Sequence, residues 1–204
     1  SIVSIIAYVL TKVSVTIFAG GIVVSSLLGI PFWIGAISTV VLTGIYTVLG
    51  GMKAVVYTET VQAIVLIIGA ATLTFMGLNA VGGWGELKAT VTPEYMNMWR
   101  PNSDPDFPWL PLVFTSSIVG IWYWCTDQTH VQRILSARTL DDSQKGALFA
   151  GFLKILPVFI LILPGVIGYV LYKDVIGTNA NQTFPVLISR LLPVGVKGIV
   201  AAAL

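Results

Sequence analysis

The sequence predicts an all-α membrane protein, and three observations support this. Of the 204 residues, 56% are hydrophobic and only 10% are charged, whereas soluble domains carry about 25% charged residues. The mean hydropathy is +0.91. No charged residue occurs between Lys12 and Lys53. Because a helix of ~20 apolar residues crosses the hydrocarbon core of a bilayer, this pattern indicates membrane-spanning helices.

Composition also excludes several classes of protein. A net charge of +2 is too small to indicate a nucleic-acid partner. The single cysteine, Cys125, excludes an intramolecular disulfide and disfavours a thiolate metal site. The sequence shows no nucleophile–base pair, phosphate-binding loop or metal-ligand cluster, so we expect neither an enzyme nor a bound cofactor. Both ends fall inside apolar runs, which predicts one transmembrane domain, residues 1–204, incomplete at both ends.

The apolar runs predict about five complete transmembrane helices and a truncated sixth. Glycine and proline mark the boundaries, as at Gly29-Ile30-Pro31 and Gly50-Gly51. Residues 79–108 hold six charged residues and four prolines and predict an aqueous loop with a short surface helix. A short amphipathic segment is expected over 184–192. The predicted transmembrane helices cover residues 2–28, 32–49, 58–78, 109–135 and 142–172, and the sixth starts near Val196.

Lys154 is a charged residue within an apolar helix. If that helix begins near Asp142, Lys154 lies ~18 Å along it and inside the bilayer. Charged groups there face a cavity or a partner and mark functional sites. The alternative is a lysine that extends to the interface from a helix starting later. Pro157 and Pro164 share a face of the same helix, and their pattern favours a kinked packing helix over direct ligation.

A second cluster of chemistry runs from Trp122 to Arg133. Aromatic rings and polar groups suit a sugar, which has apolar faces and polar edges. The same residues can form an interfacial aromatic belt, and composition alone slightly favours the belt. The predicted helix places Tyr123 and Asp127 one turn apart. His130 is interpreted as a polar residue at the helix end, without carboxylate neighbours at metal-ligand spacing.

Glu59 stands near the predicted start of the third helix. Thr58 is a candidate N-cap, and an acid in the first turn interacts favourably with the helix dipole. This structural role is the favoured interpretation of Glu59. A carboxylate on a cation route is the alternative.

Several ordered motifs resemble the sodium/glucose cotransporter family over nearly the whole chain. The motifs are Thr11-Lys12-Val13-Ser14, Tyr46-Thr47-Val48-Leu49-Gly50-Gly51, Ala54-Val55-Val56-Tyr57-Thr58-Glu59-Thr60-Val61-Gln62, Trp122-Tyr123-Trp124-Cys125-Thr126-Asp127-Gln128, Val131-Gln132-Arg133, Leu135-Ser136-Ala137, Gly151-Phe152-Leu153-Lys154, Pro157 and Pro164-Gly165.

The resemblance implies part of a LeuT-type inverted-repeat bundle, running from the family's fourth helix into its ninth. It implies that Tyr123 is the aromatic gate over the sugar, Trp124 its neighbour at the site, and Lys154 a donor to sugar hydroxyls. Glu59 matches a position usually held by aspartate and linked to sodium passage. Gly120 replaces a polar side chain of glucose- and galactose-binding members, which leaves the particular sugar open.

The implied function is sodium-coupled symport of a sugar or related polyol by alternating access. Sodium is the coupling ion, and its main site is expected largely outside these residues. The implied location is the cell membrane, plasma or inner, with lipid as the surrounding partner. Myo-inositol, another polyol and a sialic-acid-like sugar are all compatible with Gly120 as substrates. Two alternatives remain: a symporter for a non-sugar solute, and a symporter-like membrane domain of a sensory kinase.

Overall fold

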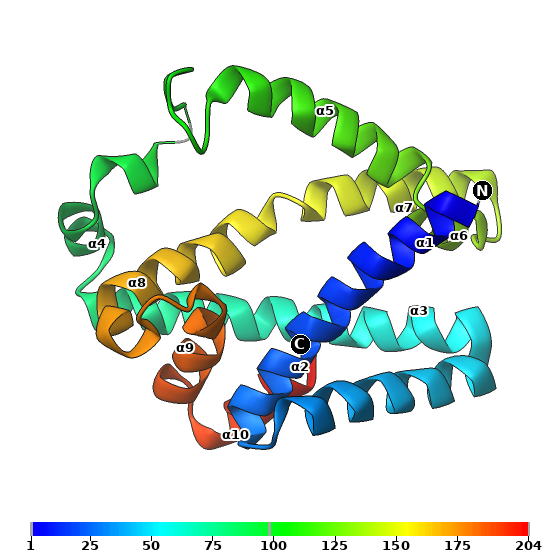
Figure 1. Cartoon of the computed structure of the whole chain (residues 1–204), viewed down its shortest axis with the longest axis horizontal. Coiled ribbons are helices and arrows are strands. Elements are labelled where there is room, and N and C mark those ends of the chain that lie inside the picture. The colour runs from blue at the N-terminus through cyan, green and yellow to red at the C-terminus, as the bar shows by residue number, and fades with distance from the viewer. Residues whose placement is uncertain (1, 98, 204) are drawn as a thin grey trace. The chain divides into compact units, whose positions relative to one another are not determined.

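A computed structural model describes residues 2–97 and 99–203, which form helices joined by turns and loops, with no strand in these two stretches (Figure 1). The chain divides into two compact units. One consists of Ser1–Gly83 and Phe159–Leu204, and the other of Trp84–Val158. The predicted all-α class is confirmed for the described residues.

The first predicted helix is confirmed as a continuous helical rod in three parts. These are α1 (Ile2–Tyr8), a π-helical turn (Val9–Val13) and α2 (Ser14–Leu28). The rod ends where Gly29 adopts a left-handed φ of 68° and its N–H donates to the carbonyl of Ser25 at 2.9 Å. Glycine is favoured at such a position because it has no Cβ to clash.

Helix α3 (Phe32–Val81) contains two helical segments that meet at Gly51, where φ is 58° and ψ is −159°. The chain folds back on itself at this point, so that the second segment returns along the first (Figure 1). At the preceding Gly50, an added Cβ would lie 2.2 Å from the Cβ of Ala54. The predicted break at Gly50-Gly51 is therefore confirmed, with a physical need for both glycines.

The predicted start of the third helix near Thr58 is wrong. Helical geometry resumes directly after Gly51, which places Thr58 in a helix interior. Its hydroxyl donates to the carbonyls of Ala54 and Val55, each at 3.0 Å. A threonine side chain bonded back to the preceding turn does not act as an N-cap. Glu59 therefore lies beyond the first turn, and the predicted dipole role does not apply.

The remaining helices of this unit pack on α2 and α3. They are α8 (Leu163–Ile176), α9 (Thr183–Leu191) and α10 (Val194–Ala203), with a 3-10 turn at Ala180–Gln182. The predicted amphipathic segment corresponds to α9, and the predicted sixth helix to α10. Close approach depends on small residues, because an added Cβ at Gly77 would lie 2.8 Å from Ile167.

The second unit contains the predicted surface helix and three further α-helices. Its elements are α4 (Trp84–Thr90), a 3-10 turn (Pro93–Met96), α5 (Trp109–Cys125), α6 (Gln128–Leu135) and α7 (Leu140–Leu153). The prediction of one helix over 109–135 is wrong, because the chain breaks at Thr126 and Asp127. Helix α7 is capped by Thr139, whose side-chain oxygen accepts from the N–H of Asp142 at 3.1 Å.

The predicted single helix over 142–172 is also interrupted. Helix α7 ends at Leu153, and a turn at Lys154 and Ile155 precedes a π-helix (Val158–Ile162) that leads into α8. Pro157 has no N–H to donate to the carbonyl of Leu153, four residues earlier, so regular α-helix cannot continue through this point. The kinked helix favoured by the two prolines is the one observed.

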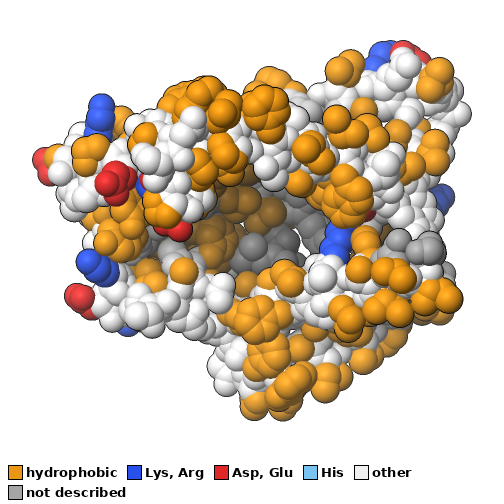
Figure 2. Space-filling model, turned by 45° about the horizontal axis from the view of Figure 1, so that its top comes forward, with side chains coloured by type: hydrophobic (Ala, Val, Ile, Leu, Met, Phe, Trp, Pro, Cys, Tyr) orange, Lys and Arg blue, Asp and Glu red, His pale blue; other side chains and the backbone are white. Residues whose placement is uncertain are grey.

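Apolar helices dominate the described residues. Three helical stretches are long and apolar enough to cross a membrane, judged by length and composition: Ile5–Leu28, Phe32–Val81 and Leu140–Ile176. Side chains such as Val48 and Leu49 are more than four-fifths exposed. Hydrophobic side chains cover much of the face in Figure 2, and charged ones are sparse there. A surface of this kind fits a lipid environment better than water.

Candidate functional site

The break between α5 and α6 has a defined hydrogen-bonding pattern. The N–H groups of Thr126 and Asp127 both donate to the carbonyl of Trp122, each at 3.0 Å. Asp127 then caps α6, because its Oδ1 accepts from the N–H of Thr129 at 3.0 Å. Asp127 is 2% exposed. A buried carboxylate at a helix start satisfies otherwise unpaired N–H groups and fixes where the new helix begins.

This break gathers three rings. The ring centres of Tyr123 and His130 lie 3.9 Å apart, and those of Trp124 and His130 lie 5.7 Å apart. Tyr123 and Trp124 meet edge to face at 5.5 Å. The Nδ1 of His130 lies 3.3 Å from Oδ1 of Asp127. We call Tyr123, Trp124 and His130 the aromatic cluster. Edge-to-face and tilted contacts of this kind stabilise ring orientation.

Lys154 completes the cluster from α7. Its backbone is the C-cap of that helix, and its Nζ lies 5.1 Å from the Tyr123 ring centre and 5.4 Å from that of Trp124. An ammonium within about 6 Å of a ring centre is attracted to the negative face of the ring. Lys154 is nevertheless exposed, so its three N–H donors remain accessible to a ligand.

The structure thus brings together the three residues that the family resemblance assigns to the substrate. Tyr123, Trp124 and Lys154 meet in the unit Trp84–Val158. Glu59 lies in α3, in the other unit, where it is half-buried. The contact of Lys154 with this cluster depends on the helix break before Pro157. Because of this break, α7 ends one residue before Lys154.

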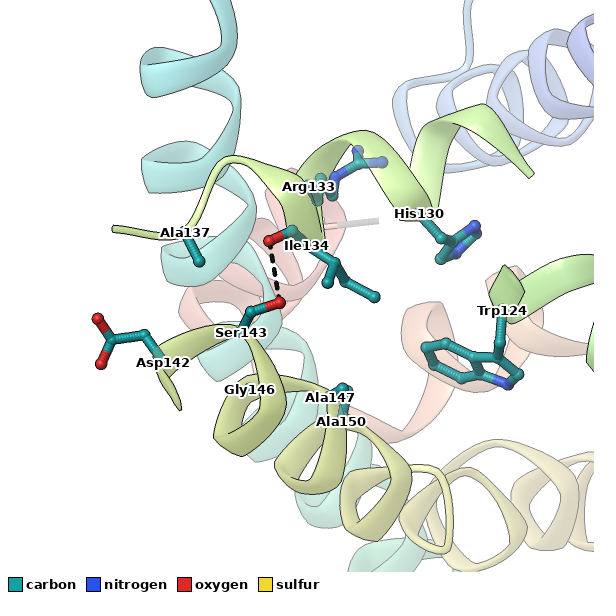
Figure 3. A pocket seen from close by; sticks show the side chains of 10 residues that line it. All are labelled: Trp124, His130, Arg133, Ile134, Ala137, Asp142, Ser143, Gly146, Ala147 and Ala150. Atoms are coloured by element: carbon teal, nitrogen blue, oxygen red, sulfur yellow. Dashed lines mark hydrogen bonds between the residues drawn. The ribbon is translucent and has the colours of Figure 1, made fainter. Parts of the chain in front are cut away.

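A pocket of about 330 Å³ opens beside the aromatic cluster, between α6 and α7 (Figure 3). A hydrogen bond of 3.2 Å from the Ser143 hydroxyl to the carbonyl of Ile134 ties the two helices together at this pocket. Arg133 donates from Nη1 to the carbonyl of Thr129 at 2.7 Å. The lining residues are Trp124, His130, Arg133, Ile134, Ala137, Asp142, Ser143, Gly146, Ala147 and Ala150.

The chemistry of this region suits a small polar molecule. Mostly apolar walls with a few directed polar groups are typical of small-molecule sites. In the part of the chain that the structure describes, no three His, Cys, Asp or Glu side chains gather as they would around a metal ion. The groups at hand are aromatic faces, an ammonium, a carboxylate and a histidine.

The sequence interpretation of His130 as a polar residue at a helix end did not include its contacts. Its ring contacts Tyr123, and its Nδ1 lies 3.3 Å from Oδ1 of Asp127. A signal was present: Asp127 precedes His130 by three residues, the spacing at which side chains share a helix face. The aromatic run before Asp127 hid the helix break that creates this arrangement.

Comparison with known proteins extends these findings. The sodium:solute symporter family model matches residues 1–204. The chain is 33% identical to the sodium/glucose cotransporter 1 of Oryctolagus cuniculus, with all of this chain and 36% of that protein covered. It is 33% identical to the sodium/myo-inositol cotransporter of Homo sapiens, with 98% of this chain and 34% of that protein covered.

A sodium/mannose cotransporter of Bos taurus is 32% identical, with all of this chain and 40% of that protein covered. The chain thus spans between about a third and two fifths of the length of these relatives. The match extends over every described helix of both units. The chain belongs to the sodium:solute symporter family.

Proposed function

We propose that this chain is part of a transporter that carries a sugar or related polyol together with sodium, by alternating access. The relatives are named as sodium-coupled cotransporters of glucose, mannose and myo-inositol, all of them polyhydroxylated molecules. The aromatic and ammonium groups that meet in the second unit suit such molecules. The contact of Lys154 with Tyr123 and Trp124 is the observation that carries the proposal.

Membership of a transporter family makes the chain part of a transport protein and not of an enzyme. Together with its apolar helices, it also makes the chain part of an integral membrane protein. We place it in the cell membrane, plasma or inner. We further propose that both compact units belong to one LeuT-type transporter domain with about five complete spans and part of a sixth. The helix breaks at Asp127 and Lys154 support this, since transporters of that type bind substrate at discontinuous helices.

The proposed substrate site consists of Tyr123, Trp124 and Lys154. The C–H faces of a sugar or polyol stack on aromatic rings, and its hydroxyl oxygens accept hydrogen bonds from an ammonium with three donors. Lys154 is already held over both rings, so little side-chain freedom is lost when it meets a substrate. Gly120 has no polar side chain to contact the substrate, so selectivity among sugars must come from other residues of the protein.

We propose that Glu59 lies on the route of the coupling sodium ion. A carboxylate in a membrane helix is costly and marks an ion path by default, and the helix-capping alternative does not apply to Glu59. Replacing Glu59 by Gln should raise the sodium concentration for half-maximal uptake. Glu86→Gln in the surface helix α4 is the control and should leave this concentration unchanged. Unchanged sodium dependence in Glu59→Gln contradicts this role.

The function is tested with the full-length protein in proteoliposomes. Uptake of glucose, mannose and myo-inositol is measured with an inward sodium gradient and with an equal potassium gradient. Sodium-dependent accumulation of at least one of these substrates supports the proposal and identifies the solute. If folded protein accumulates none of them under either gradient, sugar or polyol symport is contradicted.

A further inference from the structure

His130 is the residue of the aromatic cluster that the proposed site does not use. It belongs to α6, whereas Tyr123 belongs to α5 and Lys154 to the end of α7. Its ring is in closer contact with Tyr123, at 3.9 Å between centres, than any other ring of the cluster. Lys154 Nζ lies 5.1 Å from the centre of the same Tyr123 ring. Tyr123 is therefore in contact with a ring from α6 and with an ammonium from the end of α7.

His130 is itself held in place by Asp127. The Nδ1 of His130 lies 3.3 Å from Oδ1 of Asp127, within hydrogen-bonding distance. Asp127 is buried and is fixed by the N–H of Thr129. The imidazole orientation is thus set by the first turn of α6. Arg133 of α6 and Asp142 of α7 also line the pocket beside His130.

We propose that His130 is a positioning residue that fixes the Tyr123 ring for substrate, with Asp127 as the anchor of the imidazole. Asp127 at the start of α6 then contacts His130, and His130 contacts the Tyr123 ring, which also lies near the Lys154 ammonium. The orientation of Tyr123 follows any movement of α6, because the imidazole moves with that helix. The inference rests on the proposed transport function for its effect on substrate, but the placement of Tyr123 can be tested separately.

The first test compares variants of the full-length protein in the uptake assay. His130→Ala removes both the ring contact and the Asp127 partner, whereas His130→Phe keeps a ring. An aromatic contact shifts an equilibrium by about two- to tenfold. His130→Ala should therefore raise KM by about that factor and leave Vmax within about twofold, and His130→Phe, which keeps the ring contact but loses the Asp127 anchor, should recover part of the loss. Leu135→Ala, an exposed position on the same helix, is the control and should behave as the wild type.

The second test measures the environment of the Tyr123 ring directly and does not depend on transport. The protein is labelled with 3-fluorotyrosine, and the ¹⁹F resonance of Tyr123 is assigned by its loss in Tyr123→Phe. His130→Ala should move this resonance toward the position of an unstructured peptide, and His130→Phe should leave it dispersed. If His130→Ala changes neither the resonance nor KM, the proposal is overturned. A moved resonance in a protein without sodium-dependent uptake supports the positioning role and contradicts only the proposed function.

Discussion

The Nζ of Lys154 lies 5.1 Å from the ring centre of Tyr123, although Tyr123 lies on α5 and Lys154 is the C-cap of α7. Two local features make this contact possible. Pro157 causes α7 to end at Leu153, which leaves Lys154 in a turn. Asp127 caps α6 directly after the end of α5. Because both features are interruptions of helices, the contact depends on residues that disfavour regular structure.

Loss of the Asp127 cap should destabilise the protein. Replacing Asp127 by Ala removes an acceptor for the N–H of Thr129, and loss of an N-cap costs about 0.5–2 kcal/mol. Asp127→Asn keeps a capping oxygen and should lose less. Thermal unfolding of the full-length protein in detergent should therefore rank wild type, Asn and Ala in falling order of melting temperature. Equal melting temperatures for Ala and wild type would show that the cap does not hold α6.

Close packing at Gly77 predicts a second stability effect. An added Cβ at Gly77 would lie 2.8 Å from Cγ2 of Ile167, whereas one at Gly44 meets no atom of the described residues within 4 Å. Alanine favours helix over glycine by about 1 kcal/mol, so Gly44→Ala should keep or raise the melting temperature. Gly77→Ala should lower it, because α3 and α8 must move apart. A higher melting temperature for Gly77→Ala would contradict this packing.

The loop before α5 should depend on pH through Asp104. The backbone N–H of Phe107 is the main cause that holds the pKa of Asp104 below its ordinary value of 3.8, and the Arg100 guanidinium, 3.0 Å away, adds to it. A lowered folded pKa means that the stabilisation is present above pH 3.8 and is lost as the pH falls through the folded value. Proteolysis of the loop by pepsin should rise on acidification in wild type. In Asp104→Asn, pepsin cleavage of the loop should already be raised at the least acidic pH tested, and it should change little as the pH falls.

Much of the fold follows from the sequence because its boundaries have strong local signals. Gly29, Gly50 and Gly51 mark chain reversals that only glycine allows readily, and long apolar runs set the helix lengths. The break at Lys154 has a local cause in Pro157, but the continuous apolar pattern favoured one unbroken helix. The break at Asp127 comes shortly after an aromatic run. This run favours a continuous helix and makes the N-cap signal of Asp127 difficult to recognise.

The site was predictable only in part. Each of Tyr123, Trp124 and Lys154 could be selected by its residue type in an apolar setting and by family resemblance. The contact of Lys154 with the two rings could not be derived from spacing, since Tyr123 and Trp124 lie on α5 whereas Lys154 is the C-cap of α7, and the packing of these helices depends on the whole unit. The ring contact of His130 with Tyr123 arises from the turn at Asp127, so a prediction of continuous helix placed His130 elsewhere.

The most direct test of the proposed site is the KM of Lys154→Ala for the transported sugar or polyol, measured beside Lys145→Ala. Lys145 lies on the same helix and pairs with Asp141 at 2.6 Å, with both side chains about two-thirds exposed, and such surface pairs contribute little. Loss of a hydrogen bond from a charged group costs about 1.5–3 kcal/mol, which predicts a KM raised about tenfold or more in Lys154→Ala and unchanged in Lys145→Ala. Equal KM values in wild type and in a folded Lys154→Ala would contradict the assignment of Lys154 to the substrate site.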